Sequence, residues 1–185
     1  MNPILETILS LFYGRLLNMP ERALHGRMAW SGRCELSITF LGRLTLVFIE
    51  VKRQLSYNPH EHSKMIAQVM AEADGANLFN KESHFDDIPI RAILTDGIGF
   101  EFYFFDFKTR SIRRGISSPQ AGIPDNTFPL IVLPIFEKDR EYAIQLKVIA
   151  EVIFHEFIDS YIVGLDSQME HLAAEQSSEV VGLPG

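Results

Sequence analysis

Apolar and polar residues recur with two different periods along the chain, and the changes of period predict its elements. Apolar residues recur at steps of three and four over residues 4–16, which predicts an amphipathic first helix that ends near Asn18 and Pro20. Residues 33–40 and 44–52 have the composition of strands, and a turn at Gly42 favours a hairpin between them. The second strand is apolar on both faces until its end, which is typical of a central strand covered on each side.

The rest of the chain repeats the same kinds of element. Asn58 and Pro59 favour the start of a second helix, and Gly75 favours its end. Residues 88–94 and 100–107 predict a second hairpin. The segments that follow are a Gly-, Pro- and Ser-rich loop over residues 109–126, a short strand or helix entry over residues 128–133, and a last helix over residues 138–163.

This order of helix, hairpin, helix, hairpin and helix predicts an α/β fold with a mixed β-sheet flanked by helices. The length of 185 residues suits one domain rather than two. We expect residues 1–165 to form that single domain and residues 166–185 to form a polar C-terminal tail that is partly disordered.

Composition narrows the class of protein. Apolar residues make up 46% of the chain and charged residues 22%, which favours a globular protein with a sizeable core. The single cysteine, Cys34, excludes an internal disulfide and a four-cysteine zinc site, and it fits a reducing compartment. No uncharged apolar stretch reaches about 18 residues, and the start carries Glu6 without a basic leader. We therefore expect an intracellular protein, cytoplasmic or nuclear, with no membrane partner.

The net charge of −7 argues against binding nucleic acid through general electrostatic attraction. A polyanion would need a local basic surface instead. The first third of the chain is its basic part and includes Arg53 and Lys64. The densest basic cluster consists of Lys108, Arg110, Arg113 and Arg114. Such a cluster suits contact with phosphates, although a solvated loop would have the same composition.

Glu50 and Lys52 stand where charge is expensive, at the end of a strand that is otherwise apolar. Strand alternation places both on one face with Leu46 and Phe48. Removing an unpaired carboxylate or ammonium from water is costly, so buried groups of this kind need partners or a metal ion. The simplest interpretation is that the two pair with each other where the strand emerges into water.

Neighbouring residues favour a metal site. With the hairpin turn at Gly42, Glu35 on the preceding strand falls opposite Glu50. Two carboxylates so close raise each other's pKa unless a cation lies between them. A hard divalent cation accepts such oxygen ligands, and the carbonyl of Val51 could add another. The next helix adds a polar stripe that consists of Lys64, Gln68 and Glu72.

This arrangement resembles the PD-(D/E)XK phosphodiesterase superfamily, which has the restriction-endonuclease-like fold. The resemblance covers residues 1–165 and is strongest at Glu50-Val51-Lys52. In its amino-acid sequence the chain most resembles uncharacterised fungal members, some of them linked to Crinkler-type effector proteins. Its first acid is Glu35 where the family usually has Asp, and Gln68 lacks the Tyr that often follows it.

The resemblance also implies a site and its chemistry. It implies Glu35 and Glu50 as ligands of Mg²⁺ (or Mn²⁺). It implies Lys52 as the residue that orients the attacking water, with Gln68 as support from the helix and Glu6 as an accessory acid. The implied activity is that of a nuclease that hydrolyses DNA, favoured over RNA, and leaves a 5′-phosphate.

Two other hypotheses stay open on the sequence. A catalytically inactive copy of the fold could serve as a binding or effector module, which the acidic net charge and the Glu at position 35 favour. Alternatively, Glu50 and Lys52 only solubilise a strand end in a partner-binding domain whose real surface is the last helix. The same apolar helix could join two copies of the chain in a homodimer.

Other polar residues carry weaker hypotheses. His60 and His62 could touch a phosphate or a metal, but residues two apart do not share a helix face, so solvated first-turn side chains are favoured. Asp106-Phe107-Lys108 repeats the acid-x-Lys pattern and is interpreted as a strand end at the surface. Cys34 is a weak candidate nucleophile because no paired histidine is evident.

Overall fold

The computed structural model describes residues 3–26, 32–56, 58–115, 130–132 and 139–181. Along the chain the elements are α1 (Pro3–Ser10), β1 (Leu16–Leu24), β2 (Gly32–Phe40), β3 (Leu44–Val51), α2 (Pro59–Glu82), β4 (Ile90–Thr95), β5 (Gly99–Asp106), β6 (Ser111–Arg114), β7 (Leu130–Val132) and α3 (Asp139–Val181). The predicted α/β fold with a mixed sheet flanked by helices is confirmed.

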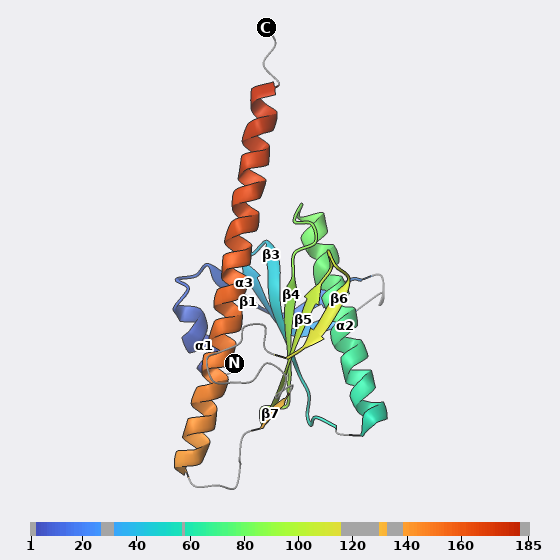
Figure 1. Cartoon of the computed structure of the whole chain (residues 1–185), viewed down its shortest axis with the longest axis vertical. Helices are drawn as coiled ribbons and strands as arrows, with labels where there is room; N and C mark the ends of the chain where they lie inside the picture. Colours follow the sequence, from blue (N-terminus) through green and yellow to red (C-terminus); the bar gives the residue numbers. More distant parts are fainter. Residues whose placement is uncertain (1–2, 27–31, 57, 116–129, 133–138, 182–185) are drawn as a thin grey trace.

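One mixed sheet forms the centre of the fold. Its strands follow one another in chain order from β1 to β6, and β7 pairs with β5. β3 and β4 are parallel because α2 carries the chain back between them, whereas the other described pairs are antiparallel. α1 and α3 lie on one face of the sheet and α2 lies on the other (Figure 1). β3 is therefore covered on both faces, as its apolar sequence predicts.

The first helix is shorter than predicted, and a strand that the pattern did not predict follows it. α1 ends at Ser10, and Tyr13 and Gly14 then have φ angles of 51° and 75°, which an α-helix does not allow. The chain enters β1, where Leu16 is buried. β1 is an edge strand, so it tolerates Pro20, the residue that made a helix end the simpler prediction.

The β2–β3 hairpin has the predicted register next to the candidate acids, since Leu36 pairs with Ile49. After Ile38 the register shifts, which leaves Leu46 as an extra residue in β3. Leu46 consequently packs in the core beneath α1 and α3, whereas Phe48 packs beneath α2. The two do not share a face, contrary to strict alternation.

α2 begins where it was predicted to begin and ends later. The side chain of Asn58 accepts a hydrogen bond from the backbone N–H of His60 at 3.0 Å and caps the helix. The prediction of an end at Gly75 is wrong, because the helix continues to Glu82. Gly26, just after β1, passes so close that a Cβ on it would lie 3.0 Å from the backbone nitrogen of Gly75. The middle of α2, residues 72–77, is consequently buried on all sides.

α3 is longer than the predicted helix over residues 138–163. Residues 166–181 continue the helix instead of forming a tail, because residues 165–181 contain neither Gly nor Pro to end it. This part of α3 extends beyond the sheet (Figure 1). No helix among the described residues combines the length and the apolar character needed to cross a membrane.

The predicted loop over residues 109–126 contains a strand at its start, β6. Residues 116–126 of that loop lie outside the described residues. The alternative between a short strand and a helix entry over residues 128–133 is decided for residues 130–132, which form β7.

Arg91 on β4 links α3 to the sheet through a buried ion pair. Its Nε lies 2.9 Å from Oε2 of Glu156, and its NH1 donates to Oγ of Ser160 at 3.1 Å. Its guanidinium also lies over the ring of Phe104, 5.3 Å from the centroid. Arg91 and Glu156 are only 6% and 3% exposed, so neither charge is compensated by water.

We expect Arg91→Met to lower the free energy of unfolding by about 3–5 kcal/mol, because it leaves the carboxylate of Glu156 buried without its guanidinium. Urea unfolding followed by circular dichroism measures this loss. The matched control is Glu151→Gln on the same helix, which removes an exposed ion pair with Lys147 and should cost less than about 1 kcal/mol. Equal losses in both variants would contradict the anchoring role.

Candidate active site

Glu50 and Lys52 lie at the end of β3 on the face that α2 covers. The Nζ atom of Lys52 is 2.6 Å from Oε1 of Glu50, so the two residues do pair. Glu50 is only 3% exposed, however, and the Lys52 side chain keeps 20% of its surface exposed. The hypothesis of a solubilising pair at a strand end therefore does not fit Glu50.

α2 adds two more side chains to this pair, Gln68 and Glu72, one helical turn apart. The amide oxygen of Gln68 accepts a hydrogen bond from Nζ of Lys52. Its Nε2 donates to Oε1 of Glu50 at 2.7 Å and to Oε1 of Glu72 at 2.8 Å. Gln68 thus joins all three charged residues.

The cluster contains two buried carboxylates and one ammonium. Oε2 of Glu50 and Oε2 of Glu72 are buried, and no residue in the described part of the chain donates a hydrogen bond to either. Burial, followed by the negative charge of Glu50, raises the pKa of Glu72 to about 8. The cluster therefore holds a proton near neutral pH, and one further cation could take its place.

The loop after β3 is fixed in the same region. The backbone N–H of Lys52 donates to the carbonyl of Thr95 at 2.7 Å, and that of Leu55 donates to Oδ2 of Asp96 at 2.8 Å. Burial acts to raise the pKa of Asp96, but the N–H groups of Leu55, Gly99 and Ile98 outweigh it and lower the pKa below its ordinary value. Asp96 is then a charged anchor for the segment that carries Lys52.

Glu35 lies outside the buried cluster. Its side chain is exposed, whereas its neighbour Cys34 is fully buried against Phe48 beneath α2. Burial, then the charges of Glu72 and Glu50, raises the pKa of the Cys34 thiol far above its ordinary value, so the thiol stays protonated and unreactive. The second carboxylate of the cluster is Glu72 instead, a residue of the polar stripe predicted on this helix.

The residues predicted to contact nucleic acid lie on different elements of the fold. Strand alternation in β6 sends Arg113 over the ring of Phe104, 4.5 Å from its centroid, while Arg114 pairs with Glu101. Arg53 and Lys64 are exposed, and Lys64 pairs with Glu61 at 2.8 Å.

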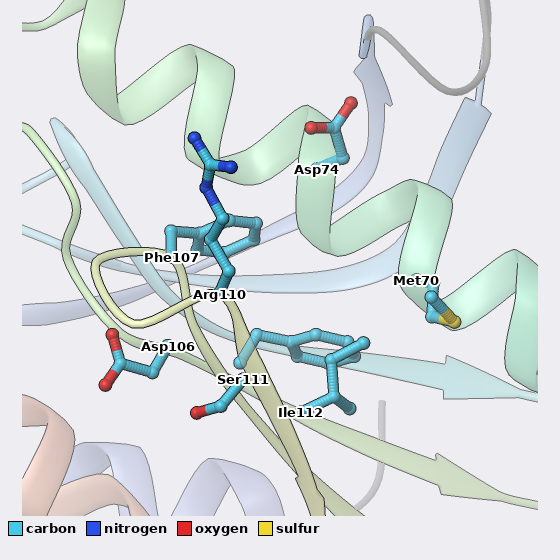
Figure 2. A pocket seen from close by; sticks show the side chains of 8 residues that line it. Met70, Asp74, Asp106, Phe107, Arg110, Ser111 and Ile112 are labelled. Atoms are coloured by element: carbon cyan, nitrogen blue, oxygen red, sulfur yellow. The ribbon is translucent and has the colours of Figure 1, made fainter.

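Lys108 and Arg110 line two separate hollows. Lys108 borders an open hollow of about 470 Å³ between the α2–β4 connection and α3, where its neighbours include Asp86, Asp166 and Glu170. That hollow is acidic and unsuited to a polyanion. Arg110 lines a smaller cavity of about 190 Å³ between α2 and the β5–β6 hairpin (Figure 2). The other lining residues of this cavity are Met70, Asp74, Phe105, Asp106, Phe107, Ser111 and Ile112.

The second acid-x-Lys sequence begins at Asp106, the last residue of β5, so it lies at a strand end, as interpreted from the sequence. Oδ1 of Asp106 accepts hydrogen bonds from the backbone N–H groups of Lys108 and Thr109 at 3.0 and 3.1 Å. The side-chain hydroxyl of Thr109 has the largest effect on Asp106, and together with these two N–H groups it lowers the pKa of the carboxyl. Its carboxylate is therefore occupied in closing the β5–β6 turn.

The cluster fits a magnesium ion, which keeps waters among its ligands, better than a metal whose ligands all come from the protein. No group of three or more His, Cys, Asp and Glu side chains among the described residues is placed to hold a metal. Mg²⁺ usually binds through one or two carboxylates and keeps waters or substrate phosphates as its other ligands. Glu50 and Glu72 supply such a pair, with a buried oxygen on each that lacks a donor. Val51 ends β3 beside them, so its carbonyl stays a candidate ligand.

Comparisons with protein-family models, curated proteins and solved structures give no match to this chain. The function therefore has to be argued from the site alone.

Proposed function

We propose that this protein is a metal-dependent phosphodiesterase of the PD-(D/E)XK type, a nuclease that hydrolyses DNA or RNA. One observation carries the proposal: two buried carboxylates, Glu50 and Glu72, each keep an oxygen without a donor beside the ammonium of Lys52. A proton or a divalent cation would complete the charge balance of this cluster, and only the cation would make a site for a phosphate.

In the proposed reaction a water oxygen bonds to phosphorus, and the bond from phosphorus to the leaving alcohol breaks. A bound Mg²⁺ or Mn²⁺ would polarise the phosphate and lower the pKa of a coordinated water. Glu50 and Glu72 would hold the ion. Lys52 has three N–H donors, of which two go to Glu50 and Gln68, so the third can orient the water or a phosphate oxygen.

An inactive binding or effector module is the second candidate. The net charge of −7 and the exposed position of Glu35, the residue that the family resemblance implies as a ligand, favour it. The buried cluster favours the enzyme. A structural ion pair needs only one carboxylate for the ammonium of Lys52, whereas the second buried carboxylate, Glu72, would be balanced by a bound cation.

The two candidates differ in one assay. We expect cleavage of a panel of labelled single- and double-stranded DNA and RNA with Mg²⁺ or Mn²⁺ and none with EDTA. Glu72→Gln should abolish cleavage, because it removes a ligand of the ion, while Glu35→Gln should retain it, because the Glu35 side chain is exposed and outside the cluster. No cleavage of any substrate, together with no metal affinity by calorimetry, would select the inactive module. Loss of activity in Glu35→Gln alone would contradict the ligand assignment.

A homodimer and a cytoplasmic or nuclear location stay predictions. The surface that α3 offers for the former is a stripe of exposed apolar residues, which consists of Ile162, Leu165, Met169 and Leu172. Light scattering of the purified protein measures its mass in solution.

A further inference from the structure

Another buried carboxylate, Glu101 on β5, holds a histidine of α2 in a fixed orientation. Glu101 is 2% exposed. Nε2 of His62 lies 2.9 Å from one of its oxygens and 3.1 Å from the other. The hydroxyl of Tyr103 donates to Oε2 at 2.6 Å, and NH2 of Arg114 forms an ion pair with the same oxygen at 2.9 Å. Burial, then Glu101, raises the pKa of the Tyr103 phenol, which keeps it a donor.

This geometry determines which nitrogen of His62 can meet a ligand. A carboxylate only accepts hydrogen bonds, so Nε2 carries the hydrogen and is occupied. Nδ1 is the other polar atom of the ring, and no bond from the described residues to it accompanies the Nε2 contacts. The side chain keeps 18% of its surface exposed. Glu101 therefore fixes the orientation of the His62 ring through its hydrogen bond to Nε2, as carboxylates commonly do for functional histidines.

The charge of the cluster favours an anion at Nδ1. Glu101 is already balanced by the guanidinium of Arg114. When His62 carries hydrogen on both ring nitrogens, Nδ1 is a donor and the cluster has a net charge of +1, which repels a metal ion and attracts a phosphate oxygen.

The cluster lies on the same face of the sheet as the candidate active site. Glu50 pairs with Leu94, and Leu94 pairs with Glu101, so these three side chains share the face that α2 covers. Two strand spacings separate Glu50 from Glu101 by about 10 Å. Along α2, His62 and Gln68 are about 9 Å apart. Phosphates rise about 3.4 Å per nucleotide along a B-DNA strand, so the two clusters are within about three nucleotides of each other.

We propose that His62, held by Glu101, binds a phosphate of the nucleic-acid strand within about three nucleotides of the phosphate that is cleaved. The substrate class rests on the proposed function. The inference adds that the substrate is a chain with at least one further phosphate, and that a diester with a single phosphate lacks this contact.

The test compares His62→Gln and His62→Asn with His60→Gln, a control on the exposed side of the same helical turn. For an oligonucleotide, we expect both His62 variants to raise KM about tenfold with little change in kcat, as the loss of one hydrogen bond to a charged group predicts. For thymidine 5′-p-nitrophenyl phosphate, which has one phosphate, we expect no change. His60→Gln should match the wild type on both substrates.

A second arm replaces single phosphates of the oligonucleotide with neutral methylphosphonates, one position at a time. At the position that His62 contacts, the methylphosphonate should raise the KM of the wild type about tenfold. The same replacement should not raise the KM of His62→Gln any further. The proposal would be overturned if the His62 variants lower kcat, or if they raise KM equally for the single-phosphate substrate. It would also be overturned if His62→Gln still shows a raised KM at every methylphosphonate position.

Binding of the same fluorescent oligonucleotides in EDTA separates this inference from the proposed function. If the wild type binds without cleaving and His62→Gln weakens binding only to the native phosphate, the nuclease proposal fails and the His62 contact holds. If the wild type cleaves and the His62 variants behave as His60→Gln does, the contact fails and the nuclease proposal holds. If the wild type neither binds nor cleaves, both fail.

Discussion

Replacing Lys52 with methionine should lower kcat for phosphodiester cleavage about 10³-fold, the loss typical when a preorganised donor to the reacting groups is removed. The same change should leave metal affinity intact, because it removes a positive charge that competes with the ion for Glu50 and Glu72. Single-turnover cleavage and calorimetric titration with Mn²⁺ measure the two effects separately.

Glu50→Gln should show the opposite division of effects. Loss of residues that only support a metal ligand costs about 10–100-fold in affinity, and loss of a ligand costs at least as much. We therefore expect weak metal binding and no detectable cleavage. Glu61→Gln is the matched control, since Glu61 lies on α2 and pairs only with exposed Lys64 in the described contacts. Activity that survives both Lys52→Met and Glu50→Gln would come from a contaminant and would end the proposal.

The fold could be predicted from the sequence where local patterns decide the structure. The turn at Gly42 fixes the register of β2 against β3, and Asn58 caps α2 as expected. β1 was missed because its Pro20 indicates a helix end as readily as an edge strand. The end of α3 was missed because residues 166–181 are mostly polar and extend beyond the sheet, so their sequence resembles that of a tail.

The candidate site could be predicted only in part, for a physical reason. Glu50, Lys52 and Gln68 follow from alternation and helix spacing. The second carboxylate does not, because the pattern alone cannot tell whether Cys34 or Glu35 turns inward. The structure buries the apolar thiol and leaves the carboxylate exposed. Glu101 lies in an aromatic strand where nothing local distinguishes it, and only the approach of His62 and Arg114 shows its use.

Metal affinity should rise steeply with pH, because a proton on Glu72 competes with the ion. The pKa of Glu72 is about 8, so below that value the ion must displace a proton before it binds. We expect the apparent affinity for Mn²⁺ to rise about tenfold per pH unit between pH 6 and 8, then to level off, with about one proton released per ion at pH 6–7. Calorimetry in buffers of different ionisation enthalpy measures both quantities.

Without metal, the same proton should make the protein less stable as the pH rises. The carboxyl of Glu72 has a pKa of 4.5 in the unfolded chain and about 8 in the folded one, so the folded state binds the proton more tightly. This contribution is fully present below pH 4.5 and is lost as the pH rises through 8, which removes roughly 3–5 kcal/mol of unfolding free energy. Urea unfolding at pH 5.5 and 8.5 measures the loss, and Mn²⁺ should restore stability at the higher pH. Glu72→Gln should abolish the difference from this group, whereas Glu61→Gln on the exposed side of α2 should not. A wild type whose stability is independent of pH and of Mn²⁺ would show that Glu72 carries neither the proton nor the ion.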